Sequence, residues 1–258
     1  MFDILASLHG KAAVVVGGSH GMGDAIVKGL EAAGAEVVIV DLTPPDAPDG
    51  EDAPPNYVAA DITDPASVAA AYEQADQRLG RLDCVINTVG VSGRDQASED
   101  MPESEWRASI DVNLNGTFWS CQQAARRMLP AGGGTIVNFS SLAGIMVART
   151  FRTVHYHAAK AAQNAMTRSL AAEWGPRGIR VNGIAPGAFS SRAGAGIFEG
   201  NMDELRAHHA RISAALPLGR IGDVSEMAPL ALFLASDASS YMTGTTTIID
   251  GGRALQVN

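Results

Sequence analysis

The sequence predicts a single-domain α/β protein with a doubly wound parallel sheet of about seven strands and helices on both faces. Short runs rich in Val and Ile alternate with longer Ala-rich segments of helical period along the 258 residues. The runs are apolar at successive positions, which is typical of parallel strands that helices cover on both sides. The Pro- and Asp-rich stretch 44–55 is too short for an interdomain linker and is interpreted as a surface loop.

Each element follows from its local pattern. We expect strands at residues 12–16, 36–40, 56–59, 84–87, 135–139, 180–184 and 246–249, and helices at 23–33, 65–79, 103–129, 156–174 and 224–234. Pro65 and Pro102 lie near the starts of two helices, and Gly34 follows the end of the first helix. These are the positions that proline and glycine favour at helix ends.

Composition and charge exclude several classes of protein. Hydrophobic residues make up 46% of the chain and charged residues 18%, which is enough apolar material for a folded core. The net charge of −9 argues against nucleic acid, because a polyanion requires a positive face. Cys84 and Cys121 form no disulfide or zinc pattern, and no His pair has ligand spacing, so we expect buried thiols and no metal. No apolar stretch is long enough to span a bilayer, so we expect a cytoplasmic protein without membrane contact.

A glycine-rich turn between the first strand and the first helix predicts a dinucleotide site. Gly17 permits the tight turn, Gly21 lets the backbone approach a pyrophosphate, and Gly23 lets the helix pack closely. The helix N-terminus supplies N–H groups and partial positive charge for phosphates. A glycine turn alone is weak, but the strand, the helix and an acidic residue 18 positions after Gly23 supply the required context. The expected cofactor contacts are Gly17, Ser19, His20, Gly21, Met22 and Gly23.

Asp41, at the end of the second strand, bears on whether the cofactor is NAD or NADP. A carboxylate there accepts hydrogen bonds from both ribose hydroxyls and repels a 2′-phosphate. No Arg or Lys follows immediately to hold that phosphate, and a neutral His20 is a poor rival to the carboxylate. The sequence therefore favours NAD over NADP.

Further along, the chain carries Asn87-Thr-Val-Gly90, Asn113 within 111–116, Ser140-Ser141 after a strand, Tyr156-x-x-x-Lys160, and Pro186-Gly187 after another strand. In this order, and from about residue 8 to 252, the segments resemble the short-chain dehydrogenase/reductase family and its Rossmann-like fold. Val16 stands where the family usually has Thr, so a side-chain hydrogen bond is expected to be lost. Thr88 and Val89 stand where it usually has Asn and Ala, and Val89 is expected to narrow the space beside the adenosine ribose.

The resemblance implies a role for each motif. The implied catalytic residues are Asn113, Ser141, Tyr156 and Lys160, with Ser140 as the alternative to Ser141 because the stretch to Tyr156 is longer than the common family spacing. The further implied cofactor contacts are Asp61 and Ile62 at the adenine, Asn87, Gly90, Tyr156 and Lys160, and Pro186, Gly187, Phe189 and Ser191 over the nicotinamide. The cofactor half would cover about 1–130, the catalytic and substrate half about 131–258, and a lid about 188–215.

Tyr156 and Lys160 have the spacing that acid–base chemistry needs. A free tyrosine has a pKa near ~10, and a lysine four residues on lies on the same helix face. Its ammonium would stabilise the phenolate and lower the tyrosine pKa. Ser141 would donate to the substrate oxygen, and Asn113, by resemblance, would hold a water that joins Lys160 to solvent. Taken alone, each feature also has a structural interpretation. The Tyr-x-x-x-Lys spacing can occur by chance on a helix, the serines can simply end a strand, and Asn113 can cap a helix.

Substrate hints are weaker. Arg149, Arg152 and Arg192 lie near the expected pocket mouth and would suit a carboxylate, although solvated side chains or a subunit contact are the favoured reading. His155 and His157 flank Tyr156 and are expected to serve packing or an interface. By resemblance, helices 103–129 and 156–174 would pair subunits into a homotetramer or homodimer.

The sequence thus predicts an NAD-dependent dehydrogenase that acts on a secondary alcohol or ketone of a small molecule, such as a polyol, sugar acid or hydroxy acid. The alternatives are an NADPH-dependent biosynthetic ketoreductase and a catalytically silent NAD-binding scaffold.

Overall fold

The computed structural model describes residues 7–46, 53–147, 151–190 and 202–255, and it confirms the predicted seven-stranded parallel sheet. The strands are β1 (Ala12–Val16), β2 (Glu36–Asp41), β3 (Tyr57–Ala59), β4 (Cys84–Asn87), β5 (Gly134–Phe139), β6 (Ile179–Pro186) and β7 (Thr246–Ile249). They lie in the order β3-β2-β1-β4-β5-β6-β7, and neighbouring strands are parallel. The order of strands therefore reverses between β1 and β4, which is where such sheets bind ligands.

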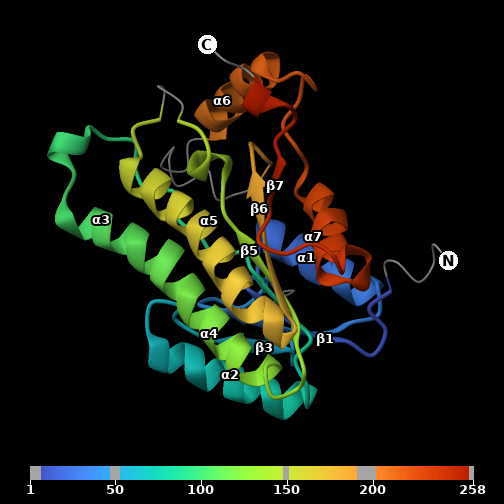
Figure 1. Ribbon diagram of the computed structural model, residues 1–258. Helices are drawn as coiled ribbons and strands as arrows, with labels where there is room; N and C mark the ends of the chain where they lie inside the picture. The colour runs from blue at the N-terminus through green and yellow to red at the C-terminus, as the bar shows by residue number, and fades with distance from the viewer. Residues whose placement is uncertain (1–6, 47–52, 148–150, 191–201, 256–258) are drawn as a thin grey trace.

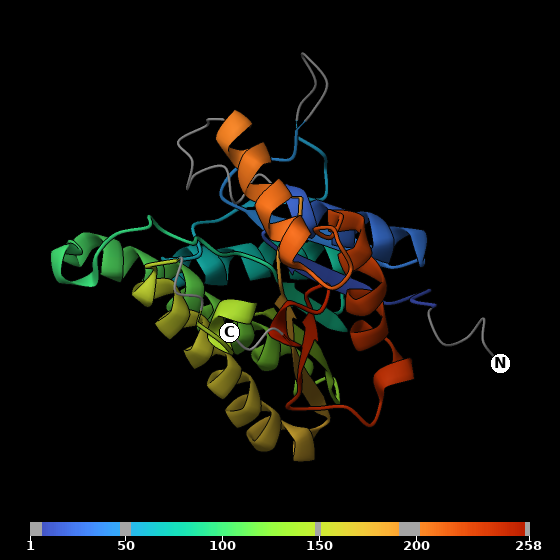
Figure 2. The same cartoon turned by 90° about the horizontal axis from the view of Figure 1, so that it is seen from above.

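Helices cover both faces of the sheet (Figures 1 and 2). They are α1 (Gly21–Ala32), α2 (Pro65–Leu79), α3 (Glu103–Ile110), α4 (Thr117–Met128), α5 (Val154–Trp174), α6 (Met202–Ala215) and α7 (Met227–Ala235). The side chains of α1 and α7 pack into one hydrophobic core, and those of α2, α4 and α5 pack into the other. Alternate residues of β1 enter the two cores: Val14 and Val16 join one, Ala13 and Val15 the other. A strand that is buried on both faces explains the continuous apolar runs.

The helix expected over residues 103–129 is interrupted by a wider turn. α3 ends at Ile110, a π-helical segment spans Asp111–Gly116, and α4 begins at Thr117. Within the π segment the Asn113 amide nitrogen donates to the carbonyls of Ser109 and Val91, each at 2.9 Å. π segments inside α-helices are rare and frequently lie at functional sites.

The expected lid is partly helical. Residues 191–201 lie outside the described residues, and α6 follows them above the carboxyl ends of the strands (Figure 1). On the near side of that gap Phe189 forms a parallel bridge with Gly222, which fixes the start of the lid. No helix in the described ranges is long and apolar enough to cross a membrane.

Candidate active site

The expected site residues gather at the carboxyl ends of the central strands, where three cavities lie. A cavity of about 340 Å³ at the glycine turn is lined by Ser19, His20 and Gly21, among others. A second, of about 270 Å³, is lined by Met22, Gly90, Ser141, Tyr156, Lys160, Pro186, Gly187 and Phe189, among others. A third, of about 160 Å³, shares Ser141 and Tyr156 with the second. Ten of the expected cofactor contacts and three of the four expected catalytic residues therefore line these two cavities.

The glycine turn has the shape that a dinucleotide phosphate requires. Gly17 has φ +83, a backbone conformation that disfavours other residues. A Cβ at Gly23 would overlap the carbonyl oxygen of Gly17, so only glycine lets α1 approach the strand end. His20, at the N-cap of α1, makes no side-chain bond to the first turn, which leaves N–H groups for a ligand. These residues fit a dinucleotide.

Asp41 is held in one orientation at the end of β2. Its carboxylate accepts hydrogen bonds from the backbone N–H of Ser19 at 3.1 Å and of Leu42 at 2.7 Å. His20 Nε2 lies 3.4 Å from a carboxylate oxygen of Asp46, so that imidazole faces an acid rather than open space for a phosphate. The Asp41 carboxylate is thus a fixed negative charge at the end of β2, which suits ribose hydroxyls.

Thr88 supplies a hydrogen bond across β1 and β4. Its Oγ1 lies 2.9 Å from the carbonyl oxygens of both Val16 and Gly17 and donates to them. The side-chain bond expected to be lost at Val16 is therefore replaced from the opposite strand. Val89 packs against the hydrophobic core.

Asp61 and Asn87 have different surroundings. The Asp61 carboxylate accepts from the N–H and the hydroxyl of Thr63, at 2.9 and 2.7 Å, and these bonds lower its pKa. It stays exposed and ionised, as an acceptor for an adenine amine requires. Asn87 is buried, and its amide nitrogen donates to Asn138 Oδ1 at 2.9 Å while its oxygen accepts from Ser120. The Asn87 side chain thus joins β4 to β5 and α4.

Tyr156 and Ser141 meet in the cavity. Burial raises the pKa of Tyr156, and a hydrogen bond from the Ser141 hydroxyl, which stabilises the phenolate, lowers it. Ser140 Oγ points elsewhere and donates to the backbone carbonyl of Lys160 at 3.1 Å. The geometry thus favours Ser141 over Ser140 as the hydroxyl that faces the phenol.

Lys160 is buried beside the phenol. Its Nζ lies 5.7 Å from the centre of the Tyr156 ring and donates to the carbonyl of Phe139 at 2.8 Å. Burial lowers the pKa of this lysine from 10.5 to about 7. A Cβ at Gly90 would lie 3.1 Å from this Nζ and 2.9 Å from Asn113 Oδ1, so Gly90 keeps the space between these side chains open.

Of the three arginines that the sequence singled out, the structure describes Arg152. It does not line these cavities and is an exposed side chain that pairs with Asp95, with 2.9 Å between Nε and Oδ1. Arg149, Arg192 and Ser191 lie outside the described residues. The arginine that lines both the 270 and the 160 Å³ cavities is Arg253, which the sequence reasoning missed. The signal was a cation directly after Asp250-Gly-Gly, at the carboxyl end of the last strand.

The two histidines beside Tyr156 have different surroundings. His155 is fully buried, and neither of its ring nitrogens has a hydrogen-bond partner among the described residues. Its Nε2 lies 3.9 Å from a Glu105 carboxylate oxygen. His157 lines the 160 Å³ cavity, and its Nδ1 is 2.8 Å from the carbonyl of Thr153. His208 and His209 of α6, which the sequence did not point to, line the 270 Å³ cavity.

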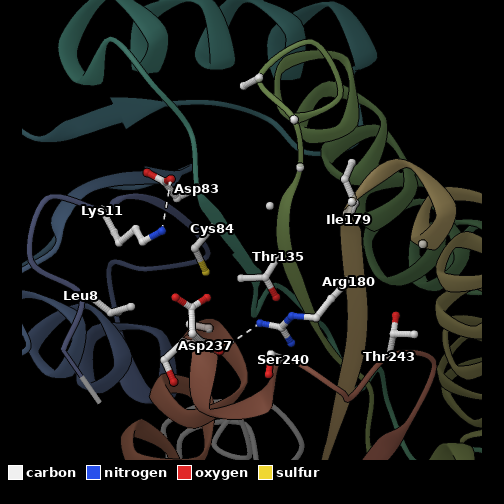
Figure 3. A pocket seen from close by; sticks show the side chains of 18 of the residues that line it. Leu8, Lys11, Asp83, Cys84, Thr135, Ile179, Arg180, Asp237, Ser240 and Thr243 are labelled. Carbon is white, nitrogen blue, oxygen red and sulfur yellow. Dashed lines mark hydrogen bonds and ion pairs between the residues drawn. The ribbon is translucent and has the colours of Figure 1, made fainter. Parts of the chain in front are cut away.

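A larger cavity of about 730 Å³ lies at the opposite edge of the sheet (Figure 3). Its charged groups satisfy one another or the backbone: Lys11 pairs with Asp83 at 3.9 Å, and Arg180 donates to the carbonyls of Leu234 and Ser236. Cys84 lies there as a buried thiol whose pKa burial raises to about 12. The expected acid–base residues Tyr156 and Lys160 do not line this cavity. In the described ranges, no group of three or more His, Cys, Asp or Glu could hold a metal ion.

The chain is similar to known proteins over nearly its whole length. Residues 16–254 match a family model described as enoyl-(acyl carrier protein) reductase. The chain is 35% identical to D-threitol dehydrogenase of Mycolicibacterium smegmatis over 96% of this chain and 95% of that protein. It is 34% identical to the NAD-dependent glycerol dehydrogenase of Listeria innocua over 99% and 98%. The crystal structure of a gluconate 5-dehydrogenase from Burkholderia cenocepacia, in complex with NADP and tartrate, superposes with a TM-score of 0.88 at 29% identity, with 100% of both chains covered.

Proposed function

The chain belongs to the short-chain dehydrogenase/reductase family, and on that premise we propose that it is an NAD(H)-dependent dehydrogenase of small polar secondary alcohols. The proposed substrates are polyols, sugar acids and hydroxy acids, and the proposed product is the ketone. One observation carries this proposal: Tyr156, Ser141 and Lys160 line the same cavity as Met22 at the start of α1, beside the phosphate cradle.

Oxidation of an alcohol requires removal of a proton from oxygen and a hydride from carbon. Bound NAD+ would supply the hydride acceptor, held by the glycine turn, Asp41 and Lys160. The Tyr156 phenolate takes the hydroxyl proton, and Ser141 donates a hydrogen bond to the same oxygen. As the C–H bond breaks with its electron pair, the carbonyl forms and Tyr156 is left protonated. Reduction of a ketone runs through the same groups in reverse.

Lys160 and Asn113 support the phenol in this scheme. Lys160 lies beside the phenol and, when it carries its proton, would stabilise a phenolate that burial disfavours. Asn113 is a positioning residue: its amide binds the loop after β4 through Val91, and this loop carries Gly90 beside Lys160.

The preference for NAD rests on Asp41. Its carboxylate is already oriented by two backbone N–H groups, so ribose hydroxyls would bind without rearrangement, whereas a 2′-phosphate would meet a fixed negative charge. Initial rates with NAD+ and NADP+ test this preference, and a higher kcat/KM with NADP+ would favour the biosynthetic reductase instead.

The family resemblance also supports a cytoplasmic homotetramer or homodimer that pairs through the helices of α4 and α5. Light scattering coupled to gel filtration tests the assembly, and a monomer at micromolar concentration would contradict it.

Tyr156→Phe tests the mechanism, with Tyr241→Phe as the matched control because Tyr241 is fully exposed. With a substrate found by NADH absorbance in an alcohol panel, we expect Tyr156→Phe to lower kcat by roughly 100-fold or more. NADH binding, measured by quenching of tryptophan fluorescence, should persist, and Tyr241→Phe should match the wild type. Unchanged turnover in Tyr156→Phe contradicts the mechanism, and an NADH-binding chain that oxidises no alcohol points to the silent scaffold.

A further inference from the structure

Arg253 is placed at the substrate side of the site by a rigid turn after β7. The Asp250 carboxylate accepts hydrogen bonds from the N–H groups of Gly252 at 2.8 Å and Ala254 at 2.7 Å. Gly251 and Gly252 have φ +64 and +88, which lets the chain fold back at the strand end. The turn therefore fixes the backbone from which the Arg253 side chain extends.

The Arg253 side chain belongs to the reacting space rather than to the surface. It lines the 270 Å³ cavity with Lys160 and the 160 Å³ cavity with Ser141 and Tyr156. It is half-buried, and its guanidinium forms no ion pair or hydrogen bond within the described part of the chain. Arg152, by contrast, is paired with Asp95. A guanidinium in a cavity without a counter-ion favours an anionic ligand.

The charge of the two cavities points the same way. Although the chain carries a net charge of −9, no Asp or Glu is among the described residues that line these cavities. Their fixed positive charge is that of Arg253, accompanied by Lys160, whose pKa burial lowers to about 7, and by the imidazoles of His157, His208 and His209. A pocket lined in this way has a positive field within a negative protein, and such a field attracts a carboxylate more than a neutral polyol.

We propose that Arg253 binds the carboxylate of the substrate while Tyr156 and Ser141 hold the hydroxyl that is oxidised, so that the enzyme prefers hydroxy acids and sugar acids to neutral polyols. The inference rests on the proposed dehydrogenase function and narrows its substrate class. The planar guanidinium can hold a carboxylate through two parallel N–H···O bonds, which a terminal CH₂OH group cannot accept in the same way.

Matched substrates test the proposal. Glycerate and glycerol, threonate and threitol, and gluconate and glucitol differ within each pair only by a carboxylate in place of a terminal CH₂OH. Initial rates of NADH formation are measured for the wild type, Arg253→Met, Arg253→Lys and the control Arg177→Met, an exposed arginine at the end of α5 that pairs with Glu173.

For the wild type we expect a higher kcat/KM with the acid in at least one pair. Arg253→Met should lower the kcat/KM for that acid by roughly 10- to 100-fold, mainly through KM, because a hydrogen-bonded charge pair is lost. The kcat/KM for the neutral polyol of the pair and the KM of NAD+ should each change by less than about twofold, because Arg253 is expected to contact neither the polyol nor the cofactor. The kcat/KM of Arg253→Lys for the acid should lie between those of the wild type and Arg253→Met, since lysine keeps the charge but cannot donate two parallel hydrogen bonds. Arg177→Met should match the wild type.

A binding measurement is independent of turnover. Malonate carries carboxylates but no hydroxyl to oxidise, and its titration into the protein–NADH complex is followed by calorimetry at constant ionic strength. We expect binding to the wild type and to Arg177→Met and none to Arg253→Met.

The outcomes separate the two proposals. If the wild type has equal kcat/KM values for acids and polyols, and Arg253→Met leaves these values unaltered, the proposed role of Arg253 is overturned. The proposed dehydrogenase function would still stand. A rise in the KM of NAD+ in Arg253→Met with every substrate overturns that role too, because the arginine would then hold the cofactor. If no member of either series yields NADH, the proposed function fails for this class, and malonate binding that survives in Arg253→Met would overturn the carboxylate site.

Discussion

Lys160 is expected to lower the stability of the fold at neutral pH, and replacing it tests how strongly burial acts on it. The side chain is 2% exposed, and burial lowers its pKa from 10.5 to about 7. Between these two values the unfolded chain binds a proton that the folded chain does not, so the stability of the folded state rises with pH through this window. Removing the ionisable group by Lys160→Met should remove that dependence.

The magnitude follows from the two pKa values. The difference between 10.5 and about 7 corresponds to a penalty of roughly 5 kcal/mol below pH 7, where the lysine is charged in both the folded and the unfolded state. Between pH 7 and pH 9 about 2 kcal/mol of this penalty disappears. The hydrogen bond from Nζ to the Phe139 carbonyl is also lost in Lys160→Met, but that loss is largely independent of pH.

The assay is urea unfolding of the cofactor-free protein at pH 7 and pH 9, followed by the fluorescence of the three tryptophans. Burial raises the pKa of Cys84 and Cys121 to about 12, so their ionisation in the unfolded state lowers stability as pH rises above about 9. That effect is common to wild type and variant and cancels in their difference.

Lys28→Met is the matched control, since Lys28 is 72% exposed on α1 and pairs with Asp24. We expect Lys160→Met to be more stable than the wild type at pH 7, to lose about 2 kcal/mol of that advantage at pH 9, and to be inactive at both. Lys28→Met should follow the wild type. If the difference between wild type and Lys160→Met is the same at both pH values, the reasoning from burial is refuted.

Three further predictions concern the cofactor and the serine pair. Ser141→Ala should lower kcat by roughly 100-fold, whereas Ser140→Ala should cost about 1 kcal/mol of stability in urea unfolding with kcat nearly intact; the reverse result would reassign the catalytic hydroxyl. Asp41→Ala should reduce the preference for NAD+ over NADP+, measured as the ratio of kcat/KM values, by roughly 10- to 100-fold, and an unaltered ratio would show that other groups choose the cofactor. Gly23→Ala should abolish NADH binding in fluorescence titration and lower Tm, because its methyl group would overlap the Gly17 carbonyl; normal binding would mean that the turn can relax.

The sheet could be predicted closely because its signals are local. The sequence pattern predicts α2 to the residue: Asp64 accepts from the N–H of Ala66, Pro65 begins the helix, and Gly80 ends it with φ +66. The β1 and β4 runs are likewise exact in their bounds, since strands buried on both faces leave long apolar runs between polar neighbours.

The parts that could not be predicted depend on packing between distant segments. The π segment around Asn113 follows from the hydrogen bonds to Ser109 and Val91, which no helical period in the sequence reveals. The ion pair that Arg152 forms with Asp95, 57 residues away, likewise depends on packing between distant segments. Arg253 reaches the site because β7 lies beside β6 in the sheet, a neighbour relation that only the folded topology provides.

The π-helical segment at Asp111–Gly116 joins α3 to α4 and sets the rotation of one helix relative to the other. An α-helix turns by about 100° per residue. A π-turn accommodates one extra residue, so it rotates α3 relative to α4, which packs on the sheet, and thereby sets which side of α3 faces its neighbours. Deleting one residue there would restore regular winding and swing Ser109 away from the Asn113 amide to which its carbonyl is bonded. The number of residues in this one stretch therefore sets the mutual orientation of the two helices α3 and α4.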